Sequence, residues 1–168
     1  ATCMGEEIVL KLGTQAQASS DWIGYLDRVN TRLGELSGGT MRIEIALGGQ
    51  LGSNAEHWAQ MNAGTLDLVA QGCDAPSVAP GGKDFDIVNL PFLFDDVDHW
   101  HRFLKSDIFA EMNAKFSEKT DVVYVGHLAD IAPRALTTGK VPVYKVSDIK
   151  GLVIRVPGSA LQTQVWAD

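Results

Sequence analysis

The sequence predicts an α/β fold built on an open, mostly parallel sheet. Between residues 8 and 70, strand-like and helix-like segments alternate in the order strand, helix, strand, helix, strand, which is typical of parallel strands joined by crossover helices. The chain has 168 residues, of which 45% are hydrophobic and 21% are charged. It is therefore long and apolar enough to bury one well-packed domain, and it is neither fibrous nor disordered.

The first two predicted elements are a buried strand and an amphipathic helix. Residues 8–13 are almost all apolar, as in a strand that is covered on both faces. Residues 19–21 (Ser-Ser-Asp) offer caps for the start of the helix, and Ser37-Gly38-Gly39 ends it. The apolar stripe of this helix has helical spacing and consists of Trp22, Leu26, Val29, Leu33 and Leu36.

A second strand, a second helix and a third strand follow. Residues 41–47 alternate between polar and apolar, as expected for a strand near the edge of a sheet. Ser53 and Glu56 have the spacing of a capping box, which predicts the start of a helix that carries Trp58. Residues 66–70 predict the third strand, so the alternating order is complete.

The next segment predicts a loop, two helices and another strand. Residues 74–83 are rich in Pro and Gly and show no regular pattern. Loops of this kind lie at the carboxyl ends of the strands, where ligands bind in this architecture. Apolar spacing predicts helices over 97–104 and 108–116, and residues 122–125 predict a strand.

The run 151–156 is the most informative part of the chain, because it places Arg155 inside an otherwise apolar strand that ends at Pro157-Gly158. A guanidinium cannot become neutral by losing a proton, so a buried one needs an anionic partner, and its planar fork of donors matches a carboxylate. Two interpretations remain open. The partner is an internal Asp or Glu, with the side chain snorkelling from the end of the strand, or it is the carboxylate of a ligand.

Composition excludes two classes of function. The formal net charge is −7, and the 14 basic residues are scattered among 21 acidic ones, which argues against a nucleic-acid-binding surface. No stretch approaches the ~20 apolar residues that span a bilayer, so we expect nothing membrane-embedded. A protein of negative charge that binds an anion needs a few donors aimed into a cleft.

The two cysteines are not expected to form a disulfide. Cys3 precedes the first predicted strand and Cys73 follows the third. In a parallel sheet these positions lie at opposite ends of the strands, farther apart than the ~7 Å that a bridge allows between Cα atoms. We therefore expect two thiols.

Motifs for catalysis, nucleotide binding and metal binding are absent. The loop 48–53 lacks both the Lys of a P-loop and the glycine spacing of a dinucleotide fingerprint. His99 and His101 would point to different sides of a helix, and His57 and His127 have no neighbour at ligand spacing. No nucleophile elbow occurs. We therefore predict no catalytic residues, no metal site and no cofactor.

Short motifs occur in a fixed order along the chain. They are Gly49-Gln50-Leu51-Gly52-Ser53, Gly64-Thr65-Leu66-Asp67, Leu90-Pro91-Phe92-Leu93-Phe94, the segment 132–138 around Arg134, and Gly151-Leu152-Val153-Ile154-Arg155-Val156-Pro157. In this order and spacing they resemble the solute-binding proteins of TRAP transporters, the tripartite ATP-independent periplasmic transporters of the DctP-like family. The resemblance runs from about Ile8 to the last residue, and its final motif is the most specific.

The resemblance implies a periplasmic-binding-protein-like architecture, in which two α/β lobes clamp an organic anion. Family members are nearly twice as long as this chain, so residues 1–126 are expected to form the first lobe and residues 127–168 the beginning of the second. The implied protein is a periplasmic monomer that captures a small organic acid and delivers it to TRAP membrane permease subunits by hinge closure, without catalysis.

The resemblance also implies which side chains hold the ligand. The arginine of the final motif, Arg155, would make the main salt bridge to the ligand carboxylate, and Arg134 matches an assisting arginine. The first lobe would contribute Gln15, Ser53 and Gln71, which are polar and uncharged and suit a ligand with hydroxyl or keto groups.

Each of these assignments has a structural alternative. Arg134 could pair with Asp130 or Asp148, and Ser53 is expected to serve mainly as a helix cap. Two other classes of function also remain open: a ligand-sensing module that partners a receptor, and a small α/β enzyme with an unrecognised site.

Overall fold

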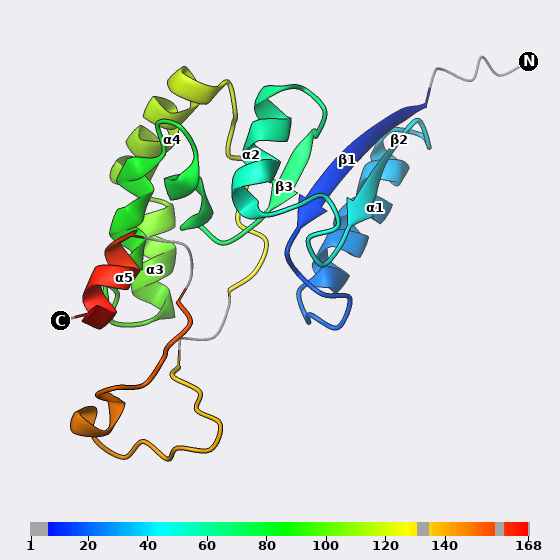
Figure 1. Cartoon of the computed structure of the whole chain (residues 1–168). Helices are drawn as coiled ribbons and strands as arrows, with labels where there is room; N and C mark the ends of the chain where they lie inside the picture. The colour runs from blue at the N-terminus through cyan, green and yellow to red at the C-terminus, as the bar shows by residue number, and fades with distance from the viewer. Residues whose placement is uncertain (1–6, 131–134, 157–159, 168) are drawn as a thin grey trace, which may run out of the picture. The chain divides into compact units, whose positions relative to one another are not determined.

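The computed structural model describes residues 7–130, 135–156 and 160–167 (Figure 1). The chain divides into two compact units, residues 1–129 and 130–168. The elements of the first unit are β1 (Ile8–Thr14), α1 (Ile23–Leu36), β2 (Met41–Ala46), α2 (Asn54–Asn62), β3 (Leu68–Ala70), η1 (Ala75–Val78), η2 (Lys83–Asn89), α3 (Val97–Leu104) and α4 (Asp107–Thr120). Those of the second unit are η3 (Val146–Ile149) and α5 (Ala160–Ala167).

The sheet of the first unit is parallel and has the strand order β2-β1-β3 (Figure 1). Ile8 lies opposite Met41 in β2, and Leu12 lies opposite Leu68 in β3. The α/β prediction is therefore confirmed, and β2 lies at the edge of the described sheet, as its alternating pattern predicted.

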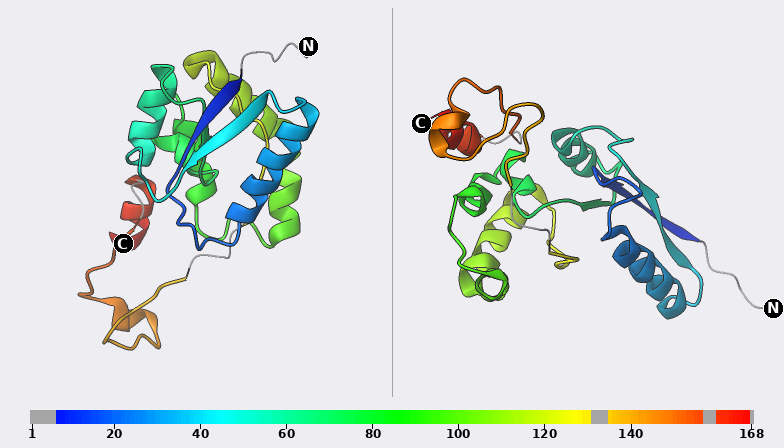
Figure 2. Two further views of the ribbon diagram at one scale, coloured as in Figure 1. Left: turned by 90° about the vertical axis from the view of Figure 1, so that its right-hand side faces the viewer. Right: turned by 90° about the horizontal axis from the view of Figure 1, so that it is seen from below.

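The two crossover helices cover opposite faces of this sheet, α1 on one face and α2 on the other (Figure 2). The strand order requires this, because the connection from β1 to β2 runs in the opposite direction across the sheet to the connection from β2 to β3, and both crossovers are expected to be right-handed. On the α1 face, Leu12 and Ile43 pack with Leu26 in one buried cluster. On the α2 face, Gly13 of β1 lies against His57.

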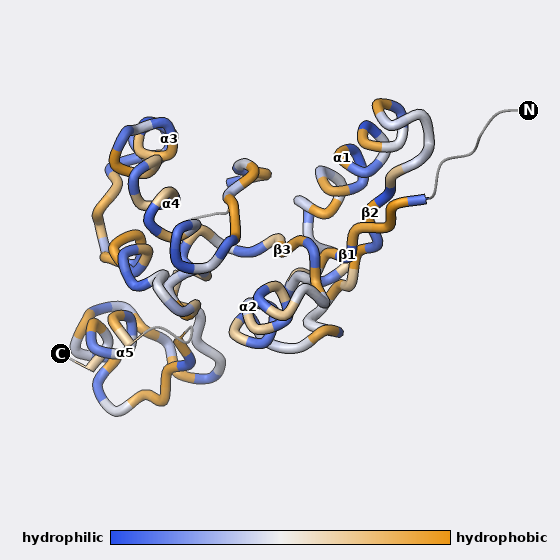
Figure 3. The backbone as a smooth tube through the Cα atoms, turned by 90° about the horizontal axis from the view of Figure 1, so that it is seen from above, coloured by the Kyte–Doolittle hydropathy of each residue, from blue (hydrophilic) through white to orange (hydrophobic). Residues whose placement is uncertain are grey.

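A second, aromatic cluster lies beside α2, where Trp58 and Phe116 meet edge to face with ring centroids 5.6 Å apart. Phe85 contacts both Phe109 and Phe116 in the same T-shaped manner. The indole Nε1 of Trp58 donates to the Ala75 carbonyl at 3.1 Å, so the polar atom of this side chain is also satisfied. Figure 3 shows the hydrophobic runs of β1 and β3 in orange between the helices.

Helix starts are predicted well where a side chain caps the helix. The Ser53–Glu56 capping box opens α2, and Asp96 caps α3 by accepting from the His99 backbone at 2.6 Å. The helix predicted after residues 19–21 is present as α1, but its predicted cap is wrong, because Trp22 occupies the N-cap position and no side chain caps the helix. Its C-terminal stripe residue Leu36 is 70% exposed, whereas Leu26 is buried.

The segment predicted as an irregular loop, residues 74–83, contains η1 and reaches the start of η2. A 3₁₀ turn tolerates Pro76 near its start, where no intrahelical donor is needed. Gly82 then passes so close to the Pro76 carbonyl that any Cβ would collide with it. The Pro and Gly residues therefore specify compact turns and not a loop without structure.

Two predicted strands, 122–125 and 152–156, are not formed, although both segments lie within the described residues. A strand exists only when a neighbouring strand completes its ladder of hydrogen bonds. Neither segment pairs with another strand among the described residues, so its apolar pattern is realised only as irregular chain. Farther along the chain, Ala160 begins the helix α5. Among the described helices, none combines the length and the apolarity needed to cross a membrane.

Candidate ligand-binding site

Gln15 and Gln71 lie at the same edge of the sheet. Thr14 and Ala70 are the last residues of β1 and β3 and lie opposite each other in the parallel register. Gln15 and Gln71 directly follow them, so both side chains belong to the carboxyl edge, where ligands bind in open α/β sheets.

Gln15 joins this edge to the loop that precedes α2. Its Nε2 donates to the Gly52 carbonyl at 2.6 Å, and the Gly49 backbone N–H donates to the Thr14 carbonyl at 2.9 Å. Gly49 has φ +72°, and a Cβ there would lie 2.8 Å from the Gln15 Oε1. The positive φ favours glycine at this turn, whereas the flexible end of the Gln15 side chain could move away from a Cβ.

Ser53 stands at the end of the same loop and caps α2. Its hydroxyl accepts from the Glu56 N–H at 3.4 Å, and its own N–H donates to the Glu56 Oε2 at 2.7 Å. The hydrogen bond from the Ser53 N–H is the main reason why the pKa of Glu56 lies below its usual value. The capping role expected for Ser53 is therefore present.

Gln71 contacts a residue that sequence analysis placed outside the site. Its Nε2 lies 3.0 Å from Nδ1 of His57, which projects from α2 and is 0% exposed. Burial lowers the pKa of His57 below its usual value, so the ring is neutral near pH 7. The sequence signal that could have indicated the burial of His57 is its spacing. His57 lies four residues before Met61, so the two side chains share one face of α2.

Arg155 is exposed, and no carboxylate of the described residues forms an ion pair with its guanidinium. The internal Asp or Glu partner considered for it is therefore not found in these parts of the chain.

Arg134 lies outside the described residues, as does Cys3, so the predictions that depend on them stay predictions. Asp148, a possible partner of Arg134, accepts hydrogen bonds from the backbone N–H groups of Tyr144 and Lys145 at 3.1 and 3.2 Å.

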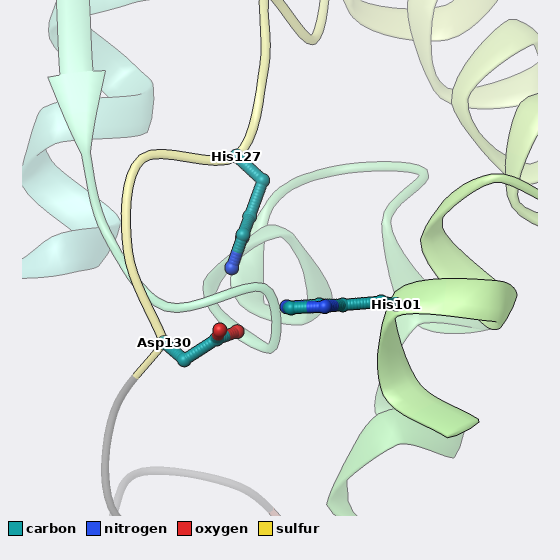
Figure 4. Close-up of side chains that lie close together, drawn as sticks. All are labelled: His101, His127 and Asp130. Carbon is teal, nitrogen blue, oxygen red and sulfur yellow. The ribbon is translucent and has the colours of Figure 1, made fainter. Parts of the chain in front are cut away.

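The fold corrects the view that His127 is isolated. Its ring lies beside that of His101 in α3, with centroids 6.1 Å apart (Figure 4). Asp130, three residues along the chain, already belongs to the second unit. Two neighbouring histidine rings do not by themselves assign a metal site.

Comparison with known families gives one match that covers most of the chain. The family model described as bacterial extracellular solute-binding protein, family 7 (DctP), matches residues 12–168. A solute-binding protein of Sulfitobacter sp. strain NAS-14.1 is 32% identical over 130 residues, which cover 76% of this chain and 38% of that protein. The sialic acid-binding periplasmic protein SiaP of Vibrio cholerae is 27% identical, with 95% of this chain and 48% of SiaP covered.

A solved structure is similar over nearly the whole chain. It is the crystal structure of a TRAP periplasmic solute-binding protein from Sulfitobacter sp. NAS-14.1 with bound α-D-taluronate, with a TM-score of 0.72 and 25% identity. The match covers 96% of this chain and 51% of the other. This chain thus spans about half or less of the length of the relatives that it matches.

Proposed function

Because this chain belongs to the bacterial extracellular solute-binding proteins of family 7, we propose that it captures an organic acid anion outside the cytoplasm and delivers it to a TRAP membrane permease. Residues 1–126 form the first of two lobes, and residues 127–168 begin the second. The protein acts as a monomer and closes on its ligand by hinge motion. It catalyses no reaction and needs no cofactor.

The observation that carries this proposal is the exposed guanidinium of Arg155. It is a fixed positive charge that is exposed and has no acidic partner in the described residues, and it lies within the part of the chain that the family model matches. A planar guanidinium binds both oxygens of a carboxylate at once. We assign Arg155 the ligand carboxylate, with Arg134 in an assisting role.

The first lobe favours a hydroxylated acid. Gln15 and Gln71 place two neutral amides at the carboxyl edge of the sheet, and a neutral amide can bond hydroxyl groups without requiring a charge on the ligand. The Sulfitobacter structure that resembles this chain holds a sugar acid, α-D-taluronate. We therefore propose a sugar acid or a related hydroxy acid as the ligand class.

Calorimetric titration with D-galacturonate and with its uncharged amide tests the anion requirement, and it is done on the protein with both lobes complete. The acid should bind at least about tenfold more tightly, because the amide cannot form the charge-assisted pair. Equal affinity for the acid and the amide would refute carboxylate capture. Uptake of labelled galacturonate by membrane vesicles that contain a TRAP permease, with and without the protein, tests delivery.

A further inference from the structure

Within the described parts of the chain, the buried His57 and the half-buried Gln71 each hold one buried polar atom without a hydrogen-bond partner. The Nδ1 of His57 lies 3.0 Å from the Gln71 Nε2. The other ring nitrogen, His57 Nε2, and the other amide atom, Gln71 Oε1, are buried and make no hydrogen bond to any residue that the structure describes. Buried polar atoms without partners are costly and uncommon, so this arrangement calls for a functional explanation.

The His57 ring packs directly against the backbone of β1. A Cβ on Gly13 of β1 would lie 3.1 Å from His57 Nε2 and 3.2 Å from its Cε1, so the ring edge occupies the space that a side chain at position 13 would fill. Leu66 borders the same space, since its Cδ2 lies 3.2 Å from that Cβ position. The ring therefore has little freedom to turn, and Gln71 is its polar contact.

The protonation of the ring decides which way the Gln71 amide faces. A neutral imidazole carries one N–H, and the other nitrogen is an acceptor. With Nδ1 as the acceptor, the Gln71 NH₂ group donates to it, and the amide oxygen Oε1 points away from the ring. A leucine at position 57 would remove that acceptor and leave the amide free to turn over.

We infer that His57 is a positioning residue that holds the Gln71 amide through Nδ1, so that Oε1 serves as an acceptor for a hydroxyl group of the ligand. This inference rests on the proposed function and adds to it: the site selects acids that carry a hydroxyl donor over acids without hydroxyl groups. Gln71 belongs to the carboxyl edge of the sheet together with Gln15, which is the edge where such a hydroxyl would arrive.

The first experiment needs no ligand. In the ¹⁵N-histidine-labelled chain, long-range ¹H–¹⁵N spectra should show His57 as the neutral Nε2–H tautomer from pH 8 to about pH 7. Its signals are identified by their absence in His57→Asn, and His99→Asn is the matched control on a half-buried ring. The Gln71→Leu variant should shift the His57 Nδ1 resonance. A ring that is charged at pH 7, or an Nδ1 resonance that Gln71→Leu leaves unchanged, would overturn the inference.

The second experiment measures selectivity in the two-lobe protein with D-galacturonate, which has hydroxyl groups, and succinate, which has none. His57→Leu should weaken galacturonate binding about tenfold, the loss of one oriented hydrogen bond, and leave succinate binding within about twofold. His57→Asn should restore selectivity, because its Oδ1 can accept from Gln71 at the position of Nδ1. Circular dichroism checks that both variants are folded.

Each outcome of the second experiment has a consequence. An equal loss for both acids, no loss in His57→Leu, or no rescue by His57→Asn means that His57 does not set the selectivity. If the wild-type protein binds neither acid, the proposed function and the selectivity both fail, while the first experiment still decides whether His57 positions Gln71.

Discussion

Arg155 can be tested by a substitution that keeps its charge. In the two-lobe protein, Arg155→Lys should weaken carboxylate binding by an amount on the order of 2 to 4 kcal/mol, because an ammonium is a point charge that cannot hold both carboxylate oxygens. Arg134→Lys should cost less. Calorimetry with D-galacturonate measures both effects.

A matched control for this substitution is Arg42→Lys. Arg42 lies in β2, where it pairs with Glu7 at 2.8 Å, far along the strand from the carboxyl edge. It should bind galacturonate as the parent does. If Arg155→Lys also binds like the parent, Arg155 is only a structural residue.

His57 predicts how stability depends on pH. Burial lowers its pKa in the folded state below the usual 6.5, so the unfolded chain takes up a proton first as the pH falls. The contribution of His57 is therefore complete above about pH 6.5 and is lost as the pH falls through its lowered pKa. Thermal unfolding between pH 7 and pH 5 should show a smaller loss in His57→Asn than in the wild type.

A substitution at the end of the same helix that removes no titrating group, Asn62→Ala, supplies the comparison for this effect. This variant should keep the pH dependence of the wild type. Wild-type and His57→Asn curves that run parallel would show that His57 titrates in the same way folded and unfolded.

At the scale of single residues, the sequence predicted two site residues in loops and missed His57, whose place in the site depends on packing. Gln15 and Gln71 could be named because the family resemblance places ligand contacts in the loops after the first and third strands, and the fold brings both to one edge. His57 could not, because its burial depends on Gly13 leaving room on a strand 44 positions earlier, and no local pattern records that contact.

At the scale of elements, α2 offers a direct test of its capping box. Ser53→Ala should lower the free energy of unfolding by about 1 kcal/mol, since the Glu56 N–H loses its acceptor, whereas Ser53→Asp should stay close to the parent. Urea denaturation measures both variants.

Two other serines make this test specific. Ser106 caps α4 by accepting from the Phe109 N–H at 3.3 Å, so Ser106→Ala should cost about as much as Ser53→Ala. Ser20 was a candidate cap for α1 but caps nothing there, so Ser20→Ala should change the stability by less than about 0.5 kcal/mol. Equal effects at Ser20 and Ser53 would mean that capping is not the cause.

Elements that interactions between near neighbours in the sequence specify could be predicted, and elements that need a distant partner could not. The capping box of α2 and the Asp96 cap of α3 lie within a few residues of the helices they open. The segments 122–125 and 152–156 have apolar patterns but no partner strand in the described chain, so the pattern was insufficient. In residues 74–83, the same Pro and Gly that suggested a loop specify 3₁₀ turns.

At the scale of the whole molecule, the two-lobe proposal predicts a large effect of length. A polypeptide limited to these 168 residues should bind galacturonate far more weakly than the protein with both lobes complete, because an exposed Arg155 gains little from a carboxylate in water. Calorimetry on both forms measures the difference. Equal affinities would mean that these residues contain the entire site and that the two-lobe proposal is wrong.

The strand order of the sheet also determines when its central strand can pair with both neighbours during synthesis. β1 is made first but lies between two strands that are made later, and the Lys11 N–H donates to the Asp67 carboxylate, 56 residues farther along. A ribosome that adds about 5–20 residues per second needs about 3–11 s for that stretch. During those seconds one edge of an apolar strand is open to wrong pairing. The central position of β1 therefore sets the time during which a chaperone can bind this strand before its second neighbour is made.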